Sequence, residues 1–322
     1  MENFDPALIS VVMPCYNAAP YVKAAIESVL QQSYRHVELI LVDDGSSDES
    51  VNIITDLAAR NPDRITVLHQ INSGPYTARN HGLSHAHGNF IAFLDADDTW
   101  HPDALNQLHA AMTETLADVA YCGWQNVGEA AVNTQAHIPP NYAESDAAAL
   151  FLQSCPWPIN GVLVRRQLID SLRGFSERLP TAMDYDLWLR MLAAQPTVVR
   201  VPLALAFYRR YPRGDAQIPR WRQVFDAIAV REDFVRHHRP QVAHLSRAER
   251  DTRVYGSLLA EAYRCHWRRD IESSRRLFRR ALRKAHWKAR DAKYILSSLL
   301  PAPALKSLIR FIDARRSRHA AF

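Results

Sequence analysis

The chain has 322 residues, 48% of them hydrophobic, which is enough for one large domain with a smaller appended region. It contains no C-x-x-C pair, so neither a disulfide framework nor a zinc site is indicated, and a reducing cytoplasm is favoured. The N-terminus lacks the basic and apolar regions of a signal peptide, and no apolar run is long enough to span a membrane. We therefore expect a cytoplasmic protein.

The net charge of +5 conceals a division of the chain into an acidic and a basic part. Residues 216–322 contain 25 of the 39 lysines and arginines and 10 of the 34 acidic residues, a net charge of +15, which leaves −10 for residues 1–215. Such asymmetry indicates an acidic body that can hold a metal ion, joined to a basic region that meets an anionic surface. We expect a catalytic domain over residues 1–215 and a basic α-helical region over residues 216–322.

Apolar strands alternate with amphipathic helices in the first third of the chain. Short apolar runs predict strands over residues 9–14, 37–44, 65–70 and 89–95. Helical spacing predicts helices over residues 21–33 and 76–86, and another that begins with Ser46 or Ser47 as its N-cap. This alternation is typical of a parallel, doubly wound α/β sheet, so polar residues that follow the strands should meet at one edge.

Three aspartates follow the fourth predicted strand, where its apolar run ends. On an extended chain, Asp95 and Asp97 share one face and Asp98 takes the other. Carboxylates this close resist ionising together unless a cation neutralises them, and Mg²⁺ or Mn²⁺ held by carboxylates and a diphosphate would do so. The alternative is an acidic turn before a helix, with Asp98 or Thr99 as N-cap and Pro102 in the first turn.

Polar residues also follow the other predicted strands. They are Tyr16 and Asn17 after the first strand, Asp43 and Asp44 at the end of the second, and Asn72 and Gly74 after the third. An aromatic ring such as that of Tyr16 can stack on a base, and a carboxylate such as Asp44 can accept from a base N–H or a ribose hydroxyl. Arg79, in the next helix, can contact a carbonyl or a phosphate. Together these residues indicate a nucleotide pocket, although each alone fits an ordinary edge, turn or surface position.

Several ordered motifs carry a specific resemblance. VVMPCYN, LVDDGSSD, NSGPYTARNHG and FLDADD resemble the N-terminal half of the family 2 inverting glycosyltransferases, which use nucleotide-sugars and have the GT-A fold. Further along, GFSERLPTAMDYDLWLRML resembles the acceptor-side motif of that family. The resemblance covers residues 8–212 and implies a nucleotide-binding half over residues 8–115 and an acceptor half over residues 116–215. It implies a divalent ion, Mn²⁺ or Mg²⁺, and a nucleoside-diphosphate sugar as donor, most commonly a UDP-sugar.

The resemblance also implies roles for particular residues. Asp97 corresponds to a metal ligand, and Asp184 corresponds to the base that deprotonates the acceptor hydroxyl. The residues expected at the nucleotide-sugar are Pro14, Tyr16, Asn17, Asp43, Asp44, Asn72, Gly74, Arg79, Asp95 and Ala96. A divalent ion that bridges the diphosphate stabilises the leaving group, so a single carboxylate base is sufficient for an inverting transfer.

The predicted base lies at the start of an amphipathic helix. Asp184 could equally be the N-cap of this helix, and Asp186 in the first turn shares that role and is the alternative base. Met183 stands where the family usually has Glu, so a polar contact to a sugar is expected to be missing.

Further contacts are expected around this centre. Tyr211 stands where the family often has a metal-binding His, so Tyr211 and Asp215 are candidates for additional contacts with the metal or the diphosphate. Trp157 and Asn160, in a loop stiffened by prolines, and Asp98 are candidate contacts with a sugar or the acceptor. A buried structural role is the alternative for Trp157.

The C-terminal region has helical spacing throughout. Its last helix places apolar residues opposite basic ones: Leu305, Leu308, Ile309 and Ile312 against Lys306, Arg310, Arg315 and Arg316. Such a helix can lie in the interface of an anionic bilayer, so we expect the C-terminal helices to contact the cytoplasmic face of the inner membrane. The alternative is that these helices pack on the catalytic domain with solvated arginines.

Two other classes of function fit parts of the chain. Asp95 and Asp97 match the D-x-D-x-T motif of haloacid-dehalogenase-type phosphatases, but those enzymes usually place this strand early. Trp267 and Trp287 stand among arginines, as in a nucleic-acid-binding surface, but an acidic body with a metal-type cluster argues against this function. We expect a glycosyltransferase with a glycan, lipid-linked or protein acceptor, acting in cell-surface polysaccharide, lipopolysaccharide or other glycan assembly, and no nucleic-acid partner.

Overall fold

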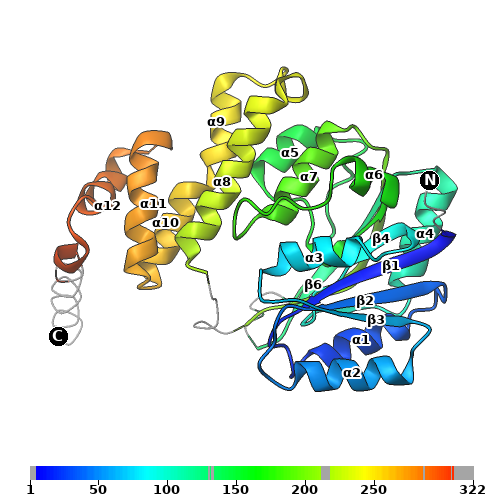
Figure 1. The fold of residues 1–322 in the computed structure, drawn as a ribbon. Helices are drawn as coiled ribbons and strands as arrows, with labels where there is room; N and C mark the ends of the chain where they lie inside the picture. The colour runs from blue at the N-terminus through cyan, green and yellow to red at the C-terminus, as the bar shows by residue number, and fades with distance from the viewer. Residues whose placement is uncertain are drawn as a thin grey trace. The chain divides into compact units, whose positions relative to one another are not determined.

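The structure, a computed structural model, describes residues 5–129, 131, 134–211, 218–285, 287–305 and 307 (Figure 1). Its contacts divide the chain into two compact units. The first contains Met1–Ala147 and Cys155–Ala216, and the second contains Ala148–Ser154 and Gln217–Phe322. The expected domain boundary after residue 215 lies in the segment 212–217, outside the described residues, and stays a prediction.

The first half of unit 1 is a parallel sheet covered by helices. The strands β1 (Asp5–Cys15), β2 (Val37–Asp43), β3 (Ile65–His69) and β4 (Gly88–Phe93) pair in parallel in the order β3-β2-β1-β4. The connecting helices are α1 (Val22–Leu30), α2 (Ser50–Arg60) and α3 (Pro75–Leu83). This arrangement confirms the predicted α/β fold with a mostly parallel sheet.

The second half of unit 1 extends the same sheet to eight strands and turns it back toward the end of β4. β7 (Val162–Arg165) pairs antiparallel with β4 and with β6 (Val119–Val127), β6 pairs in parallel with β8 (Val198–Arg209), and β8 pairs antiparallel with β5 (Thr99–Trp100). The remaining elements are α4 (Ala104–Thr115), η1 (Ile159–Gly161), α6 (Arg166–Ser171) and α7 (Met183–Ala193). The pairing of β8 with β5 brings the end of β8 to the segment that follows β4.

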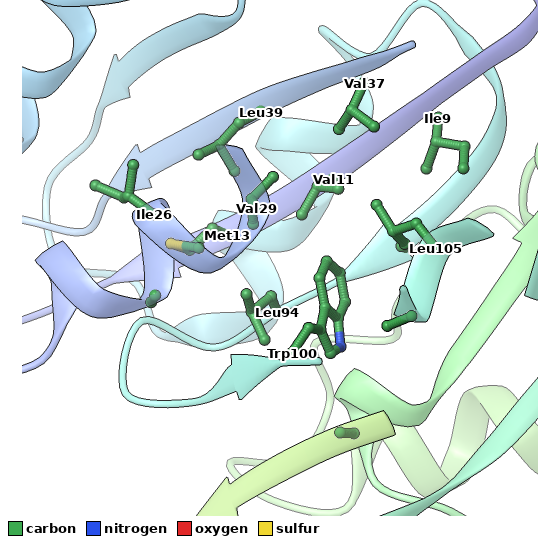
Figure 2. Close-up of a cluster of buried hydrophobic side chains, with 14 of the residues drawn as sticks. Ile9, Val11, Met13, Ile26, Val29, Val37, Leu39, Leu94, Trp100 and Leu105 are labelled. Atoms are coloured by element: carbon green, nitrogen blue, oxygen red, sulfur yellow. The ribbon is translucent and has the colours of Figure 1, made fainter. Parts of the chain in front are cut away.

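The main core lies between the sheet and the helices α1, α2 and α4. Alternate residues of β1, namely Ile9, Val11 and Met13, are fully buried against this layer. Figure 2 shows them beside Ile26, Val29, Val37, Leu39, Leu94, Trp100 and Leu105. Because side chains on a strand alternate between faces, the remaining residues of β1 face the opposite layer, which contains α3.

A glycine lets α3 approach this second face closely. A Cβ at Gly82 would lie 2.5 Å from Cγ1 of Val12 and 3.2 Å from Cγ2 of Val42, both on the sheet. Because Arg79 lies on α3, this close packing sets the distance between Arg79 and the end of the sheet.

The start of α2 corrects a prediction. We expected Ser46 or Ser47 to be the N-cap, but the helix begins at Ser50 and its N-cap residue, Glu49, makes no side-chain capping bond. The two serines instead contact Asn17 in the loop after β1: its backbone N–H donates to Ser46 Oγ at 3.0 Å, and its Oδ1 accepts from the Ser47 N–H at 2.8 Å. The prediction failed because these long-range bonds replaced local capping.

Unit 2 is α-helical, as expected for the C-terminal region. Its elements are α5 (Ala147–Gln153), α8 (Arg220–His237), η2 (Arg239–Val242), α9 (Arg247–Tyr255), α10 (Ser257–Trp267), α11 (Ile271–Lys284), η3 (Ala289–Asp291) and α12 (Ala292–Ser297). Leu258, Leu277, Phe278 and Ile295 are buried between them. Among the residues described, no helix has both the length and the apolarity needed to cross a bilayer. Leu305 is buried, whereas Lys306 and residues 308–316 of the predicted interfacial helix lie outside the described residues.

The first residue of β4 gives a testable prediction about stability. In a Gly88→Ala variant the added Cβ would lie 2.5 Å from the carbonyl oxygen of Leu8 and 2.8 Å from the backbone nitrogen of Ser10. Because neighbouring backbone cannot rotate away, we expect the free energy of unfolding to fall by about 1–3 kcal/mol, measured by urea denaturation. The control is Gly161→Ala, whose Cβ meets atoms at 3.5 Å or more. An equal effect of both substitutions would contradict the prediction.

Candidate active site

Three carboxylates converge where β4 ends. The strand stops at Phe93, and the chain then turns, with the N–H of Asp98 donating to the carbonyl of Asp95 at 3.0 Å. As a result, Asp95, Asp97 and Asp98 each bring one carboxylate oxygen within 4.8 Å of the others. The expectation that Asp98 points to the opposite face is therefore wrong, because it assumed that the chain stays extended.

Asp98 ties this turn to two later parts of the chain. Its side chain is buried, and its Oδ1 accepts from the backbone N–H of Arg209 at 2.7 Å, at the end of β8. Its Oδ2 accepts from Nδ2 of Asn160 in η1 at 2.9 Å. Burial and the neighbouring carboxylates raise the pKa of Asp98 well above its ordinary value. The alternative role as N-cap is wrong for both Asp98 and Thr99, because α4 begins only at Ala104.

Asp97 is held by the last described residues of the strand β8 and the turn after it. The Tyr211 hydroxyl donates to Asp97 Oδ2 at 2.7 Å, and Nε of Arg209 donates to the Asp97 carbonyl at 2.9 Å. The Arg209 guanidinium also lies 4.6 Å from the ring centroid of Tyr21. Burial and the charge of Asp95 raise the pKa of Asp97, and the Tyr211 hydrogen bond opposes this rise. Tyr211 therefore contacts the predicted metal ligand directly, whereas Asp215 lies outside the described residues.

Asp95 pairs with Arg79 of α3. The guanidinium donates through Nη2 to Asp95 Oδ1 and lies near two aromatic rings, 5.4 Å from that of Tyr76 and 5.6 Å from that of Phe175. Burial alone would lower the pKa of Arg79, but Asp95, Tyr76 and Asp184 together offset this effect and the pKa is raised. The sequence pattern did not single out Tyr76 or Phe175. For Tyr76 a signal existed, because it stands three positions before Arg79 on one helix and side chains at this spacing are neighbours.

Asp44 shapes the loop between β3 and α3. It is 3% exposed, and its Oδ1 accepts from Gln70 Nε2 and from the Ser73 N–H, each at 2.8 Å. Its Oδ2 accepts from the Gly74 N–H at 2.8 Å. The carboxylate thus fixes the backbone around Gly74, and its predicted contact with a nucleoside stays a prediction.

The other residues of the predicted nucleotide pocket differ in exposure. Tyr16 is 41% exposed just after β1, so one face of its ring is available for stacking, and Asn72 is also exposed. Asp43 is buried, with Oδ1 accepting from the Ser46 N–H at 3.2 Å. Pro14 and Ala96 are buried as well, so they can contribute backbone and shape rather than exposed side chains.

The candidate base lies on the first turn of α7. Asp184 is the second residue of that helix, and Ala182 rather than Asp184 occupies the N-cap position. Burial raises the pKa of Asp184, whereas the N–H of Tyr185 and the charge of Arg79 lower it. The charge of Asp184 in turn contributes, after burial, to the raised pKa of Tyr76. These electrostatic interactions indicate that Asp184 lies close to Arg79 and Tyr76.

Asp186 has a structural role. It is buried, and its two oxygens accept from Nη2 of Arg178 at 3.0 Å and from Nε of Arg190 at 2.7 Å. Arg190 also donates to the carbonyls of Leu172 and Gly174 at 2.7 and 2.9 Å. Asp186 therefore fastens α7 to the loop that precedes it, and the assignment of Asp184 as the base stays a prediction.

Asn80 connects the donor side of unit 1 with this loop. Its Nδ2 donates to the carbonyl of Phe175 and its Oδ1 accepts from the N–H of Phe175, both at 2.9 Å. Its Nδ2 also donates to Glu177 Oε1 at 2.8 Å. Because Asn80 follows Arg79 on α3, one helix positions both the arginine and the segment that leads to α7.

Trp157 and Asn160 lie in the interior of unit 1. Trp157 is 3% exposed and stacks on Tyr121 with ring centroids 4.7 Å apart. Asn160 is fully buried, and its carbonyl accepts from Nε1 of Trp100 at 2.6 Å. The structure thus supports the alternative role of Trp157 as a buried aromatic, and gives Asn160 the role of positioning Asp98.

The carboxylate cluster fits a divalent ion. Among the described residues, Asp95 and Asp97 each keep one carboxylate oxygen that accepts no side-chain hydrogen bond. Carboxylate oxygens are the ligands that Mg²⁺ and Mn²⁺ prefer. Burial and, after it, the neighbouring carboxylates raise the pKa values of Asp97 and Asp98, and a bound cation would lower them.

Comparison with known proteins identifies related sequences. The chain matches the description "Glycosyl transferase family 2" over residues 10–169 and "Glycosyl transferase family group 2" over residues 90–306. TuaG of Bacillus subtilis, whose name assigns it to teichuronic acid biosynthesis, is 31% identical over 65% of this chain and 81% of that protein. An uncharacterized glycosyltransferase of Nostoc sp. is 35% identical over 51% of this chain, and the chain spans about half of its length, 52%.

Solved structures share the fold. TarS of S. aureus, in complex with UDP-GlcNAc, is similar with a TM-score of 0.61 and 19% identity, covering 90% of this chain and 79% of that one. A mannosyltransferase of Pyrobaculum calidifontis, in complex with GDP-Man and Mn²⁺, is similar with a TM-score of 0.60 and 18% identity, covering 97% and 81%. These likenesses confirm the GT-A expectation for the fold.

The contact between Tyr211 and Asp97 gives a prediction about metal affinity. The phenol donates to one oxygen of Asp97 and so orients the other, and loss of such a supporting bond typically weakens metal binding by about 10- to 100-fold. We expect Tyr211→Phe to weaken Mn²⁺ binding by about tenfold or more, measured by calorimetry. The control is Tyr34→Phe, which removes a hydroxyl that donates to the Ala7 carbonyl at 2.6 Å. Unchanged or tighter Mn²⁺ binding by Tyr211→Phe would contradict the prediction.

Proposed function

The chain belongs to glycosyl transferase family 2, and on that premise we propose that it transfers a sugar from a nucleoside-diphosphate sugar to an acceptor hydroxyl with inversion at the anomeric carbon. The observation that carries this proposal is the convergence of Asp95, Asp97 and Asp98 at the end of β4, beside Arg79 and Asp184. A UDP-sugar is the donor that we propose, and it is supported by the UDP-GlcNAc complex of TarS. Family membership argues against the phosphatase and the nucleic-acid-binding alternatives.

The donor would be held at the carboxyl ends of the parallel strands. Tyr16 offers an exposed ring for stacking on the base, and Asp44 fixes the loop that contains Asn72 and Gly74. Asp97, together with Asp95, would hold a divalent ion, Mn²⁺ or Mg²⁺, which when bound neutralises the charge that develops on the leaving diphosphate. Arg79, aligned by Asp95, adds a fixed positive charge at the same place.

Asp184 would act on the acceptor. A carboxylate base accepts the proton of the acceptor hydroxyl as its oxygen attacks the anomeric carbon from the face opposite the diphosphate. Burial raises the pKa of Asp184, so the carboxylate is a stronger base than an exposed aspartate. Because it acts only when deprotonated, kcat/KM should fall toward acidic pH with an apparent pKa above that of an ordinary aspartate.

The acceptor belongs to the same proposal. The name of TuaG associates that relative with a cell-surface polymer, which supports a glycan or lipid-linked acceptor in surface polysaccharide assembly. We place the enzyme in the cytoplasm, where nucleotide-sugars are made, with the C-terminal helices in contact with the anionic membrane surface.

The first test concerns metal-dependent donor binding. Asp97→Asn should lose most of the Mn²⁺-dependent affinity for UDP, because the Asn amide has the shape of the metal-binding carboxylate without its negative charge. Calorimetry with UDP, with and without Mn²⁺, measures this, and the matched control is Asp56→Asn on the exposed face of α2. Equal Mn²⁺-dependent UDP affinity in the two variants would remove Asp97 from the metal site.

The second test concerns the base. Asp184→Asn should lower turnover at saturating donor by about 100- to 10,000-fold, roughly 3 to 5 kcal/mol of barrier, while UDP affinity changes little. Asp186→Asn is the control, and it should lower the melting temperature because Arg178 and Arg190 lose their shared partner. The anomeric coupling of the product, read by NMR, should be opposite to that of the donor. Near-normal turnover of Asp184→Asn would remove it as the base, and retained configuration would overturn the mechanism.

A further inference from the structure

An exposed row of leucines lies at the end of unit 2. Leu296 is 59% exposed, Leu299 50% and Leu300 38%, whereas the intervening Ser298 and the preceding Ile295 are buried. Spacings of three and four residues put the leucines on one side of α12 and of the turn that continues it. This side therefore faces solvent while the other side of α12 packs on the unit, which reverses the usual placement of leucine.

A tryptophan belongs to the same part of the unit. Trp267, the last residue of α10, is 54% exposed, and its ring centroid lies 6.3 Å from that of Tyr294 in α12. Nζ of Lys293 lies 4.9 Å from the centre of the Tyr294 ring. We call Trp267, Leu296, Leu299 and Leu300 the leucine–tryptophan surface. Nη2 of Arg279 donates to the carbonyl of Leu299 at 2.8 Å, so the surface combines aliphatic side chains and an exposed indole with an adjacent ammonium and an adjacent guanidinium group.

The charge around this surface is strongly positive. Residues 267–300 contain 11 lysines and arginines and 3 acidic residues. The acidic residues are already engaged: Asp270 accepts from the Ser273 N–H at the start of α11, Glu272 pairs with Arg276, and Asp291 accepts from Tyr263 and from the Lys288 N–H. Glu232 of α8 pairs with Arg280 and Lys284, so residues 267–300 together with Glu232 still carry a net charge of +7.

We propose that the leucine–tryptophan surface docks unit 2 on an anionic lipid bilayer. Leucines enter the boundary between headgroups and acyl chains, tryptophan lies at the headgroup level, and basic side chains contact lipid phosphates; this is the composition typical of interfacial helices. The proposal deepens the membrane contact in the proposed function by naming its residues, and it does not depend on the donor chemistry.

A second copy of the chain fits this surface less well. A symmetric contact through the leucine–tryptophan surface would bring together two copies of residues 267–300, each with a net charge of +8. Like charges at an interface are unfavourable. An anionic bilayer instead supplies both the apolar layer and the opposite charge.

The test compares two double variants of the full chain. Leu296→Gln with Leu299→Gln removes the most exposed leucines of the surface, and Leu116→Gln with Leu203→Gln makes the same change at leucines of unit 1 that are 76% and 48% exposed. In cosedimentation with vesicles that contain about 30% anionic phospholipid, the first variant should lose about tenfold or more of its partition coefficient, and the second should match the wild type. Wild-type binding should weaken at about 1 M salt and on zwitterionic vesicles.

A spectroscopic measurement reports the insertion itself. Brominated lipids should quench part of the tryptophan fluorescence of the wild type, and Trp267→Phe should remove part of that quenching while vesicle binding persists. If quenching is equal in the wild type and Trp267→Phe, Trp267 does not enter the bilayer and the assignment of this residue is wrong.

Other outcomes would overturn the proposal. Equal vesicle binding by the two double variants would show that the leucines do not insert. A wild-type dimer in sedimentation velocity that Leu296→Gln with Leu299→Gln dissociates, without vesicle binding by either protein, would assign the surface to a second copy. UDP binding with Mn²⁺ is measured on the same samples: its presence without vesicle binding refutes only this inference, and its absence counts against the proposed function.

Discussion

The repulsion among three carboxylates at the end of β4 is the constraint around which unit 1 is arranged. Asp95, Asp97 and Asp98 bring oxygens within 4.8 Å of one another, and each is stabilised from a different part of the chain. Arg79 of α3 pairs with the first, Tyr211 after β8 donates to the second, and η1 together with the end of β8 binds the third. These partners are far apart in sequence. The strands β7, β6 and β8 bring them to the end of β4, where they offset the repulsion among the carboxylates.

The sequence was sufficient to predict the features that depend on local pattern. Unbroken apolar runs identified the parallel strands, and the polar residues after them identified the edge where the carboxylates gather, because both follow from burial and from the direction of parallel strands. The orientation of Asp98 could not be predicted, since it depends on the turn in which the N–H of Asp98 donates to the carbonyl of Asp95. Likewise, the sequence could not show that Asp44 accepts from the backbone N–H of Gly74 or where α2 starts. Both features depend on hydrogen bonds between loops.

The two acidic residues at the start of α7 show where sequence reasoning reaches its limit. Asp184 and Asp186 are equivalent by local criteria, because both lie in the first turn of one helix. Tertiary partners separate them: Arg178 and Arg190 occupy both oxygens of Asp186, whereas Asp184 is coupled to Arg79 and Tyr76. Arg190 stands four residues after Asp186 on α7, a spacing that indicates this pair from the sequence, whereas the pairing with Arg178 of the preceding loop depends on the fold. A carboxylate that two guanidinium groups hold is poorly suited to accept a proton, and this agrees with the motif resemblance, which assigns the base to Asp184.

The carboxylate cluster also links the chemistry of unit 1 to its stability. Burial and mutual charge raise the pKa of Asp97 and of Asp98, so the unfolded chain releases these protons more readily than the folded one. For such groups the contribution to stability is present at low pH and is lost as the pH rises through the folded-state pKa, so above that pKa the ionised cluster opposes folding. A divalent cation bound only by the folded state would offset that opposition by mass action. The fully buried core around Ile9, Val11 and Met13 must therefore stabilise a sheet whose edge carries crowded carboxylates, and the proposed cation would relieve the cost of that crowding.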